Sequence, residues 1–428
     1  MILAILNFVI MFLVMNVNSK KNKLFSKNSV VMSSVLLAAL GYFVDIYDLI
    51  LFSIVRIKSL KSIGVAPDEL LSQGVLVLNA QMTGMLIGGL IWGIWGDKKG
   101  RLSVLYGSII LYSLANIANG FVQDVPTYAL LRFIAGIGLA GELGAGITLV
   151  SEIMPKETRG YGTMIVATIG ILGAVVAALV GDLFDWRVAY FIGGALGFGL
   201  LLLRLTVYES GMFEAMKNKP MKRGSLKLIF KSWSSAWKYL CCILIGVPLW
   251  FVVGILITFS PELGKALGMT VAPEPGKAVM FAYIGLALGD FVSGTLSQIM
   301  QSRKKVALIF MVLMAFFITT YLLNKGVSLG VFYANCLALG FSAGYWAIFI
   351  TIAAEQFGTN IRSTVATTVP NFVRGSVVPV SYAFSQLKAS IGLVNSAFLI
   401  AGICLLMACF ALFSLKETHG KDLDFMEI

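Results

Sequence analysis

The sequence "GIWGDKKGR", residues 93–101, places an aspartate and three basic residues between two long apolar runs. The run before it covers about residues 73–96, and the run after it covers about residues 102–122. Each is about as long as the roughly 20 residues that a helix needs to cross a hydrocarbon core. A short charged turn between two such runs is typical of a helical hairpin in a membrane, with the turn at the membrane surface.

Composition extends this interpretation to the whole chain of 428 residues. Hydrophobic residues make up 58% of it, charged residues make up 13%, and the mean hydropathy is +0.89. These values exclude a soluble globular domain. The apolar runs are also too long and too continuous for the alternating strands of about ten residues in an outer-membrane barrel. We therefore expect an all-α integral membrane protein.

Twelve helices are expected to span the membrane. Their approximate ranges are 30–57, 73–96, 102–122, 126–151, 160–182, 186–208, 238–260, 276–301, 305–324, 328–357, 363–386 and 392–415. The N-terminal extension, residues 1–29, opens with "MILAILNFVIMFLVM", which is short for a span and lacks the features of a signal peptide. Either translation begins at Met15 and the first residues are a start-site artefact, or they form a helix at the membrane interface.

The basic residues predict the orientation, because lysine and arginine accumulate in short cytoplasmic loops. With the N-terminus inside, twenty-two of them fall in inner segments, eight fall in outer loops and three lie within spans. We therefore expect a multi-pass protein of the cytoplasmic (inner) membrane with both termini in the cytoplasm. The same distribution accounts for the net charge of +12, so nucleic-acid binding is not expected.

The chain divides into two halves that resemble each other. After the fourth helix, "SEIMPKETRG" places Glu152 seven residues before Arg159. After the tenth, "AEQFGTNIRS" places Glu355 seven residues before Arg362. Paired halves of this kind are common in secondary transporters, which bind their substrate between the halves near the bilayer midplane.

The halves predict the domain boundaries. An N-terminal bundle of six helices covers residues 30–208, a C-terminal bundle covers 238–415, and a cytoplasmic tail covers 416–428. The basic linker between the bundles, residues 209–237, ends in "SLKLIFKSWSSAWKYL", whose apolar residues have helical spacing. This pattern predicts an amphipathic helix on the inner membrane surface.

The loop at residues 93–101 also resembles the loop signature of the major facilitator superfamily. Gly93, Asp97, Lys98, Gly100 and Arg101 match its glycine, aspartate and basic positions, while residue 102 is leucine where the signature has a second basic residue. The resemblance implies the major facilitator fold and a latch that closes the cytoplasmic side of the protein. Pairing at the same surface is expected for the acidic and basic residues of the repeated motifs, Glu152, Arg159, Glu355 and Arg362.

Further motifs narrow the resemblance, which covers residues 30–425. The sequences "RFIAGIGLAGELGAG", "ESGMF" and "KETHGKDL" are similar to those of sugar porters and metabolite–proton symporters. They imply a small-molecule substrate such as an organic anion or amino acid, with protons and the lipid bilayer as the other partners. They also imply no enzymatic activity, no cofactor or metal, and function as a monomer.

The first helix contains two acids, Asp45 and Asp48, on one face of the apolar stretch "GYFVDIYDLILF" at residues 41–52. Helical rise places Asp48 and Arg132 of the fourth helix at similar depths in the outer part of the bilayer. Sugar porters form their proton switch from an aspartate and an arginine in these helices, so the resemblance implies that role for Asp48 and Arg132. The alternative is a permanent ion pair that fixes helix packing.

Two more acids are candidates for the proton pathway. Asp45, one turn deeper, is a second candidate carboxylate or a substrate contact. Glu142, about 15 Å from Arg132 toward the cytoplasm, is placed either to relay a proton or to make a structural hydrogen bond.

Arg374 is the main candidate for substrate binding, because it lies near the midplane of the eleventh helix and its planar guanidinium suits a carboxylate. The alternative is an ion pair with Asp290 or another acid. Other polar and aromatic residues expected to line the cavity are Asn79, Gln81, Trp250, Tyr283, Asn335, Tyr345 and Trp346.

These features predict a proton-coupled secondary transporter that works by alternating access. An uncoupled facilitator or exporter, a sugar transporter and a non-transporting nutrient sensor on the same fold remain as alternatives. The five cysteines have no metal-ligand or redox spacing.

Overall fold

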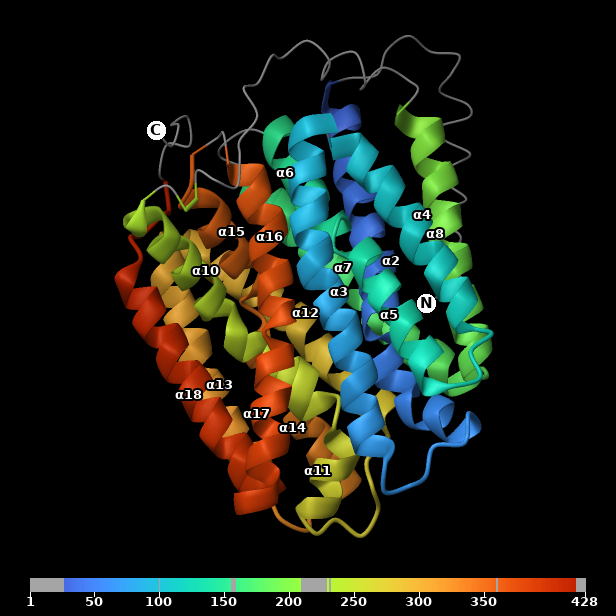
Figure 1. Ribbon diagram of the computed structural model, residues 1–428. Coiled ribbons are helices and arrows are strands. Elements are labelled where there is room, and N and C mark those ends of the chain that lie inside the picture. The colour runs from blue at the N-terminus through green and yellow to red at the C-terminus, as the bar shows by residue number, and fades with distance from the viewer. Residues whose placement is uncertain are drawn as a thin grey trace.

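The computed structural model describes residues 27–99, 101–154, 159–208, 229–230, 232–358 and 361–420. These residues form helices joined by turns, with no strand among them. The helices run side by side along the long axis of the molecule (Figure 1). The first half of the chain, coloured blue to green, lies on one side of the bundle, and the second half, yellow to red, lies on the other.

The described residues make twelve passages along the bundle, which confirms the predicted all-α membrane fold. The passages of the first half are α2 (Lys27–Ser62), α3 (Leu70–Lys99), α4 (Arg101–Asn119), α5 (Val125–Leu139) with α6 (Glu142–Ile153), α7 (Arg159–Leu183) and α8 (Trp186–Tyr208). Those of the second half are α10 (Trp233–Phe251) with the π-helix η2 (Val252–Ile257), α12 (Pro275–Ile299), α13 (Arg303–Leu323), α14 (Leu329–Ala343) with α15 (Trp346–Glu355), α16 (Arg362–Gly375) with α17 (Val377–Ile391), and α18 (Leu393–Ser414). A short helix, α11 (Ser260–Ala266), follows η2.

Ten of these passages are long and apolar enough to cross a membrane. The other two are α4 and the interrupted pair α16–α17. Most of the predicted linker lies outside the described residues, and so does the N-terminal extension up to residue 26. Trp233–Trp237, which the sequence placed in the linker, form the first turn of α10.

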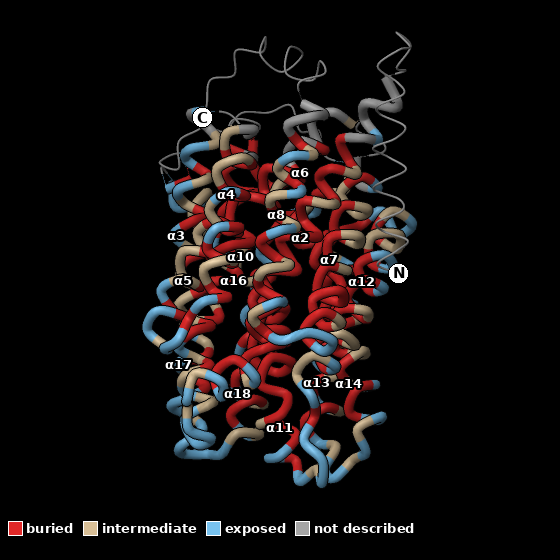
Figure 2. The backbone as a smooth tube through the Cα atoms, turned by 90° about the vertical axis from the view of Figure 1, so that its right-hand side faces the viewer, coloured by how far each residue is buried: buried red, intermediate tan, exposed pale blue. Residues whose placement is uncertain are grey.

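We call the end of the bundle where α8 ends and α10 begins the linker side, and the opposite end, which carries α11, the far side. The linker side is at the top of Figure 1. Buried positions run along the inside of the bundle, and exposed ones are concentrated at the far-side turns (Figure 2). Large apolar side chains such as Phe316, Leu406 and Phe410 are exposed on the outside, as expected of helices surrounded by hydrocarbon.

Four passages are interrupted, and in each a local cause is visible. The fourth breaks at Gly141 between α5 and α6, and the tenth breaks at Gly344 between α14 and α15. The seventh contains Pro248, which has no N–H to donate, and widens into η2 four residues later. The eleventh contains Pro370 and breaks at Ser376. Interrupted helices leave unpaired backbone groups inside the bundle, where such groups often serve substrate sites.

Glycines set the closest helix contacts, and they do so alike in both halves. A Cβ at Gly84 of α3 would overlap the backbone of Phe133 in α5, and a Cβ at Gly136 would overlap that of Gln81. In the second half, a Cβ at Gly285 or Gly340 would overlap the facing backbone in the same way where α12 meets α14. Small residues let membrane helices approach closely. These contacts pack the helices of each half tightly against one another.

The glycine contacts predict that Gly340→Ala destabilises the protein by about 1–3 kcal/mol, because the added methyl has no space against Ala282. The matched control is Gly402→Ala in α18, where an added Cβ meets no atom within 4 Å. Thermal unfolding in detergent measures both. Equal melting temperatures for the two variants would contradict the close packing of α12 and α14.

Candidate functional site

A buried ion pair joins the two halves near the middle of the bundle. Asp45 comes from α2 and Arg374 comes from the last turn of α16, and neither side chain is exposed to solvent. Arg374 Nη2 lies 3.7 Å from Asp45 Oδ2, which is within ion-pair range but too far for a hydrogen bond. Arg374 Nη1 donates to Oδ1 of Asn371 over 3.4 Å. Among the described residues, Arg374 Nε and Nη2 and both oxygens of Asp45 make no hydrogen bond.

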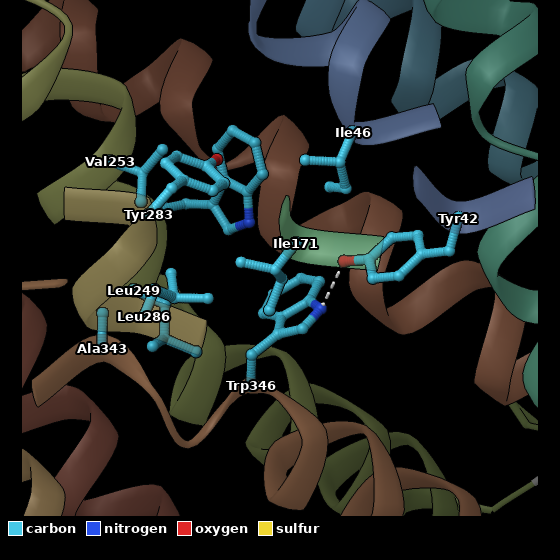
Figure 3. Close-up of a pocket in the computed structure, with 10 residues that line it drawn as sticks. Tyr42, Ile46, Ile171, Leu249, Val253, Tyr283, Leu286, Ala343 and Trp346 are labelled. Carbon is cyan, nitrogen blue, oxygen red and sulfur yellow. Dashed lines mark hydrogen bonds between the residues drawn. The ribbon is translucent and has the colours of Figure 1, made fainter. Parts of the chain in front are cut away.

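Two adjacent tryptophan rings of the second half lie beside this guanidinium. The Cζ atom of Arg374 lies 5.8 Å from the ring centre of Trp250 and 5.7 Å from that of Trp346. The two ring centres are 6.5 Å apart. Trp346 Nε1 donates to the hydroxyl of Tyr42 in α2 over 2.9 Å, as the dashed line in Figure 3 shows. Both halves therefore build the aromatic surroundings of Arg374, and cation–π attraction stabilises its charge there.

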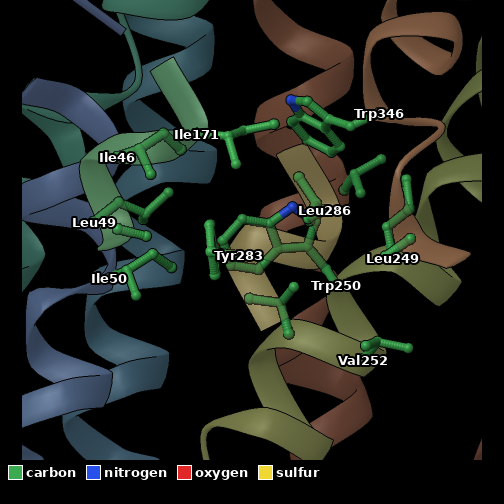
Figure 4. Packing of buried hydrophobic residues seen from close by; sticks show 14 of the residues in the cluster. Ile46, Leu49, Ile50, Ile171, Leu249, Trp250, Val252, Tyr283, Leu286 and Trp346 are labelled. Carbon is green, nitrogen blue, oxygen red and sulfur yellow. The ribbon is translucent and has the colours of Figure 1, made fainter. Parts of the chain in front are cut away.

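A small cavity lies beside the tryptophan rings. Its volume is about 20 Å³, enough for about one water molecule. The side chains around it are mostly apolar and come from both halves (Figures 3 and 4): Tyr42, Ile46, Ile171, Leu249, Trp250, Val253, Tyr283, Leu286, Ala343 and Trp346. Trp250, Tyr283 and Trp346, which were predicted to line the substrate cavity, lie at this one. The cavity has to widen before a larger molecule can enter.

The halves touch on the linker side of the cavity. Asn371 Nδ2 of α16 donates to the carbonyl of Ala140 over 2.8 Å, at the break between α5 and α6. A Cβ at Gly89 of α3 would lie 2.8 Å from Cβ of Asn371. At Gly93, the first glycine of the loop motif, a Cβ would lie 3.4 Å from Thr368. An added Cβ at Gly93 would therefore make only an ordinary van der Waals contact with α16, whereas one at Gly89 would crowd Asn371.

The halves also touch on the far side, through a second ion pair that sequence analysis did not identify. Arg56 Nη2 in α2 donates to Oε1 and Oε2 of Glu262 in α11, over 2.8 and 2.9 Å. Arg56 is fully buried, whereas 21% of the Glu262 side chain is exposed. The Phe259 ring lies 4.7 Å from the guanidinium, and Gly74 of α3 leaves room for the arginine side chain. We call the Arg56–Glu262 pair the far-side latch.

The ion pair expected between the Asp48 carboxylate and Arg132 is not formed. Arg132 Nη2 donates instead to the backbone carbonyl of Asp48 over 3.0 Å, and its other nitrogens donate to side-chain oxygens of Gln81 and Asn116. The Asp48 carboxylate lies against Gly193 of α8, where a Cβ would overlap it. Neither of its oxygens makes a hydrogen bond to any described residue. The two residues share a depth, as predicted, but the carboxylate points around the helix toward α8.

Glu142 has a partner of its own. At the start of α6, its carboxylate accepts from Nη1 of Arg204 in α8 over 3.1 Å and makes a second contact with Nη2. Both side chains are 1% exposed, and Gly41 of α2 leaves the space that the pair fills. Of the two roles that the sequence left open, this arrangement favours the structural one. The sequence could have indicated this partner, because Arg204 is a basic residue inside the predicted span 186–208.

Several other predicted residues lie away from the cavity. Asn335 Nδ2 donates to Val331 O within α14, and the residue packs beside Thr320 of α13, away from this cavity. Tyr345 does not line the cavity either, and its hydroxyl donates to Ile245 O of α10. Asn79 of α3 accepts from Ser381 of α17, toward the far side. Asp290 accepts from the backbone N–H of Ala347, so it does not pair with Arg374.

Little of the predicted surface motif can be followed in the structure. Gly100 lies outside the described residues, and the same holds for the side chains of Asp97, Lys98, Arg101, Glu152, Arg159 and Arg362. Glu355 is described and lies 3.6 Å from Arg303 at the start of α13, a partner that sequence analysis did not name.

The tail motif "KETHGKDL" has a structural role at the start of α13. Glu417 accepts from the backbone N–H of Arg303 over 3.0 Å and of Lys304 over 3.2 Å, and also bonds Ser302 Oγ. Partial burial acts to raise the pKa of Glu417, but hydrogen bonds from Ser302 and from backbone N–H groups outweigh it and lower the pKa to about 2. Glu417 therefore caps the N-terminus of α13 and fixes the segment that follows α18 against it.

The family is shown by comparison with known proteins. Residues 31–378 match the sequence model of the Major Facilitator Superfamily. The chain therefore belongs to this family of membrane transporters. Its fold is similar to that of the proton:xylose symporter XylE solved with 6-bromo-6-deoxy-D-glucose, with a TM-score of 0.71, 17% identity, and 93% of this chain and 98% of that chain covered.

Curated relatives are similar over most of the chain. The niacin transporter NiaP of Acinetobacter baylyi is 23% identical over 421 residues, which cover 90% of this chain and 94% of that protein. The 3-(3-hydroxy-phenyl)propionate transporter of Escherichia coli is 26% identical over 301 residues, which cover 67% of this chain and 71% of that protein.

The far-side latch generates a prediction for Glu262→Gln. Losing the charge weakens the contact, and each 1 kcal/mol lost would raise a small population open to the far side about five-fold. A Ser260→Cys reporter is fully buried beside the latch and reports this opening as faster labelling by a membrane-impermeant maleimide. Cys409, which is partly exposed, is replaced by serine in all samples.

The control for the latch is Glu274→Gln, which removes an exposed ion pair with Lys277 on the same side of the bundle. Exposed pairs contribute little, so its labelling rate should match that of the parent. Equal rates in the Glu262 and Glu274 variants would show that the latch does not hold the far side closed.

Proposed function

We propose that the protein carries a small organic anion across the inner membrane by alternating access, together with protons. The linker side and both termini face the cytoplasm, in agreement with the distribution of basic residues. The observation that supports the substrate class best is the fully buried Arg374, which has unused hydrogen-bond donors and lies beside two tryptophan rings.

Arg374 provides the anchor for the anion. A guanidinium presents parallel N–H groups that a carboxylate accepts at about 2.7–2.9 Å, and here Nε and Nη2 have no such acceptor among the described residues. Trp250 and Trp346 offer flat apolar surfaces beside the charge. A carboxylate attached to a planar ring therefore fits the site. The names of the two curated relatives agree with an aromatic organic anion, since niacin and 3-(3-hydroxy-phenyl)propionate each combine an aromatic ring with a carboxylate.

The buried charges support coupling to a proton. The middle of the bundle holds four buried acids and three buried arginines: Asp45, Asp48, Glu142, Asp290, Arg132, Arg204 and Arg374. A bound monovalent anion adds a further negative charge to this set, and one proton offsets it. Unbalanced charge is costly inside a membrane, so the anion and the proton favour each other's binding.

Asp48 is the proposed proton carrier, with Arg132 as its basic neighbour and Asp45 as the second candidate. Its carboxylate is fully buried and makes no hydrogen bond to any described residue. Arg132 is fixed by Gln81 and Asn116 and bonds the Asp48 backbone. It therefore lies beside the carboxylate without being bound to it, so a proton can be gained or lost without breaking a bond.

Uptake of radiolabelled nicotinate into proteoliposomes tests the anchor. A pH gradient, acidic on the side of entry, should drive accumulation by the parent protein. Arg374→Ala should weaken binding about ten-fold or more, because the charged hydrogen bonds are lost. Arg374→Lys should fall between the two, because it keeps the charge and loses the planar fork. Undiminished uptake by Arg374→Ala would remove Arg374 from the substrate site.

A comparison of accumulation with exchange in the same vesicles tests the coupling. Asp48→Asn mimics the protonated acid, so it should still exchange nicotinate when both sides are loaded. It should no longer accumulate nicotinate under a pH gradient, since no proton accompanies the anion. Glu274→Gln is the control and should do both. Retained accumulation by Asp48→Asn would rule out Asp48 as the carrier and move the role to Asp45.

A further inference from the structure

The two ion pairs between the halves differ in a way that burial alone does not explain. In the far-side latch, which is partly exposed, both carboxylate oxygens lie within 2.9 Å of one arginine nitrogen. Asp45 and Arg374 are both fully buried, yet their closest atoms are 3.7 Å apart. The lower dielectric constant around the deeper pair should strengthen the attraction between Asp45 and Arg374. Its long distance therefore shows that the surroundings of Asp45 and Arg374 do not let the two groups bind tightly.

We infer that Asp45 acts as an internal competitor for the substrate, occupying Arg374 between transport cycles and yielding it to the substrate carboxylate. This inference rests on the proposed binding of an organic anion at Arg374. A tight pair would exclude the anion, while a bare arginine would leave a buried charge unbalanced. A loose partner avoids both problems, because it balances the charge and remains weaker than a carboxylate that forms hydrogen bonds of normal length.

Among the described residues, the groups around Asp45 supply no second cation that would hold its charge once Arg374 binds the substrate. Glu142 of α6 acts on Asp45 electrostatically, and Arg204 holds that acid in place. Asp48 lies one turn along α2, and the hydroxyl groups of Tyr42 and Tyr112 complete the set. None of these groups brings a second cation into ion-pair range of Asp45 among the described residues.

The ease with which the charged Asp45 leaves Arg374 then depends on whether Asp48 is protonated. While Asp48 is ionised, its charge repels that of Asp45 and offsets the positive field of Arg132. With a proton on Asp48, this repulsion disappears. The proton therefore makes the release of Arg374 easier, which links the two carboxylates of α2 in one exchange.

Competition also predicts selectivity. A neutral molecule of the same shape can stack on the tryptophan rings, but it has no charge with which to displace Asp45. The protein therefore discriminates against such a molecule, because binding it would require the Asp45–Arg374 contact to break without a new partner for Arg374. Nicotinate and nicotinamide differ in this respect and little in size, so they are a suitable pair of probes.

Equilibrium binding of radiolabelled nicotinate and nicotinamide to purified protein tests the competition. Asp45→Asn removes the competing charge and should lower the Kd for nicotinate about five-fold or more, equivalent to about 1 kcal/mol, with little change for nicotinamide. Asp45→Glu keeps the charge and reaches further toward Arg374, so it should raise the Kd for nicotinate. A group with only a structural role would weaken binding in both variants. Glu274→Gln is the unaffected control.

The outcomes separate this inference from the proposed function. If the parent protein does not bind nicotinate, the proposed site fails for this probe and the inference falls with it. If the parent binds nicotinate and Asp45→Asn binds it no more tightly, only the inference is overturned. Should Asp45→Asn fail to fold, Asp45→Glu decides alone, since unchanged or tighter nicotinate binding by that variant contradicts the competition.

Discussion

Charge balance inside a low-dielectric bundle is the constraint on which the rest of this structure depends. An unpaired guanidinium or carboxylate is costly there, and the described core contains several of each. Within the first half, Glu142 and Arg204 form a two-bond pair that Gly41 accommodates. Across the halves, Asp45 and Arg374 only approach each other. The tight pair inside the first half and the loose pair between the halves at Asp45 and Arg374 leave this central part of the interface as the place where charges can exchange partners.

Packing follows the same division. Glycine contacts bring α3 to α5 and α12 to α14 at backbone distance, so each half resists deformation. The interrupted passages lie where the halves face each other: Asn371 of α16 bonds the break after α5, and Trp346 at the break after α14 bonds Tyr42. The glycine contacts inside each half need not break when the halves move as units. The proposed alternating access therefore requires little change within either half.

The sequence predicted the number of helices, the two halves and the depth of the buried charges, because these follow from run length and helical rise. It could not predict the partner of each charge, because depth along a helix does not determine the direction in which a side chain points. Asp48 and Arg132 illustrate this: they meet through a backbone carbonyl while the carboxylate turns to Gly193. Asn335 is another example, since its side chain faces α13 and lies away from the cavity. The far-side latch depends on α11, a helix too short to detect by its periodicity.

The different surroundings of the two pairs between the halves suggest an order of events. Glu262 is partly exposed, so water can solvate the charges of the far-side latch as it opens. Asp45 and Arg374 are fully enclosed, and the neighbouring cavity holds about one water molecule. Their separation therefore needs another anion close by. In the proposed uptake from the far side, the latch would have to open before the substrate could reach Arg374, and the central pair would exchange only once the anion had arrived. A halfway opening without substrate would leave the central charges paired.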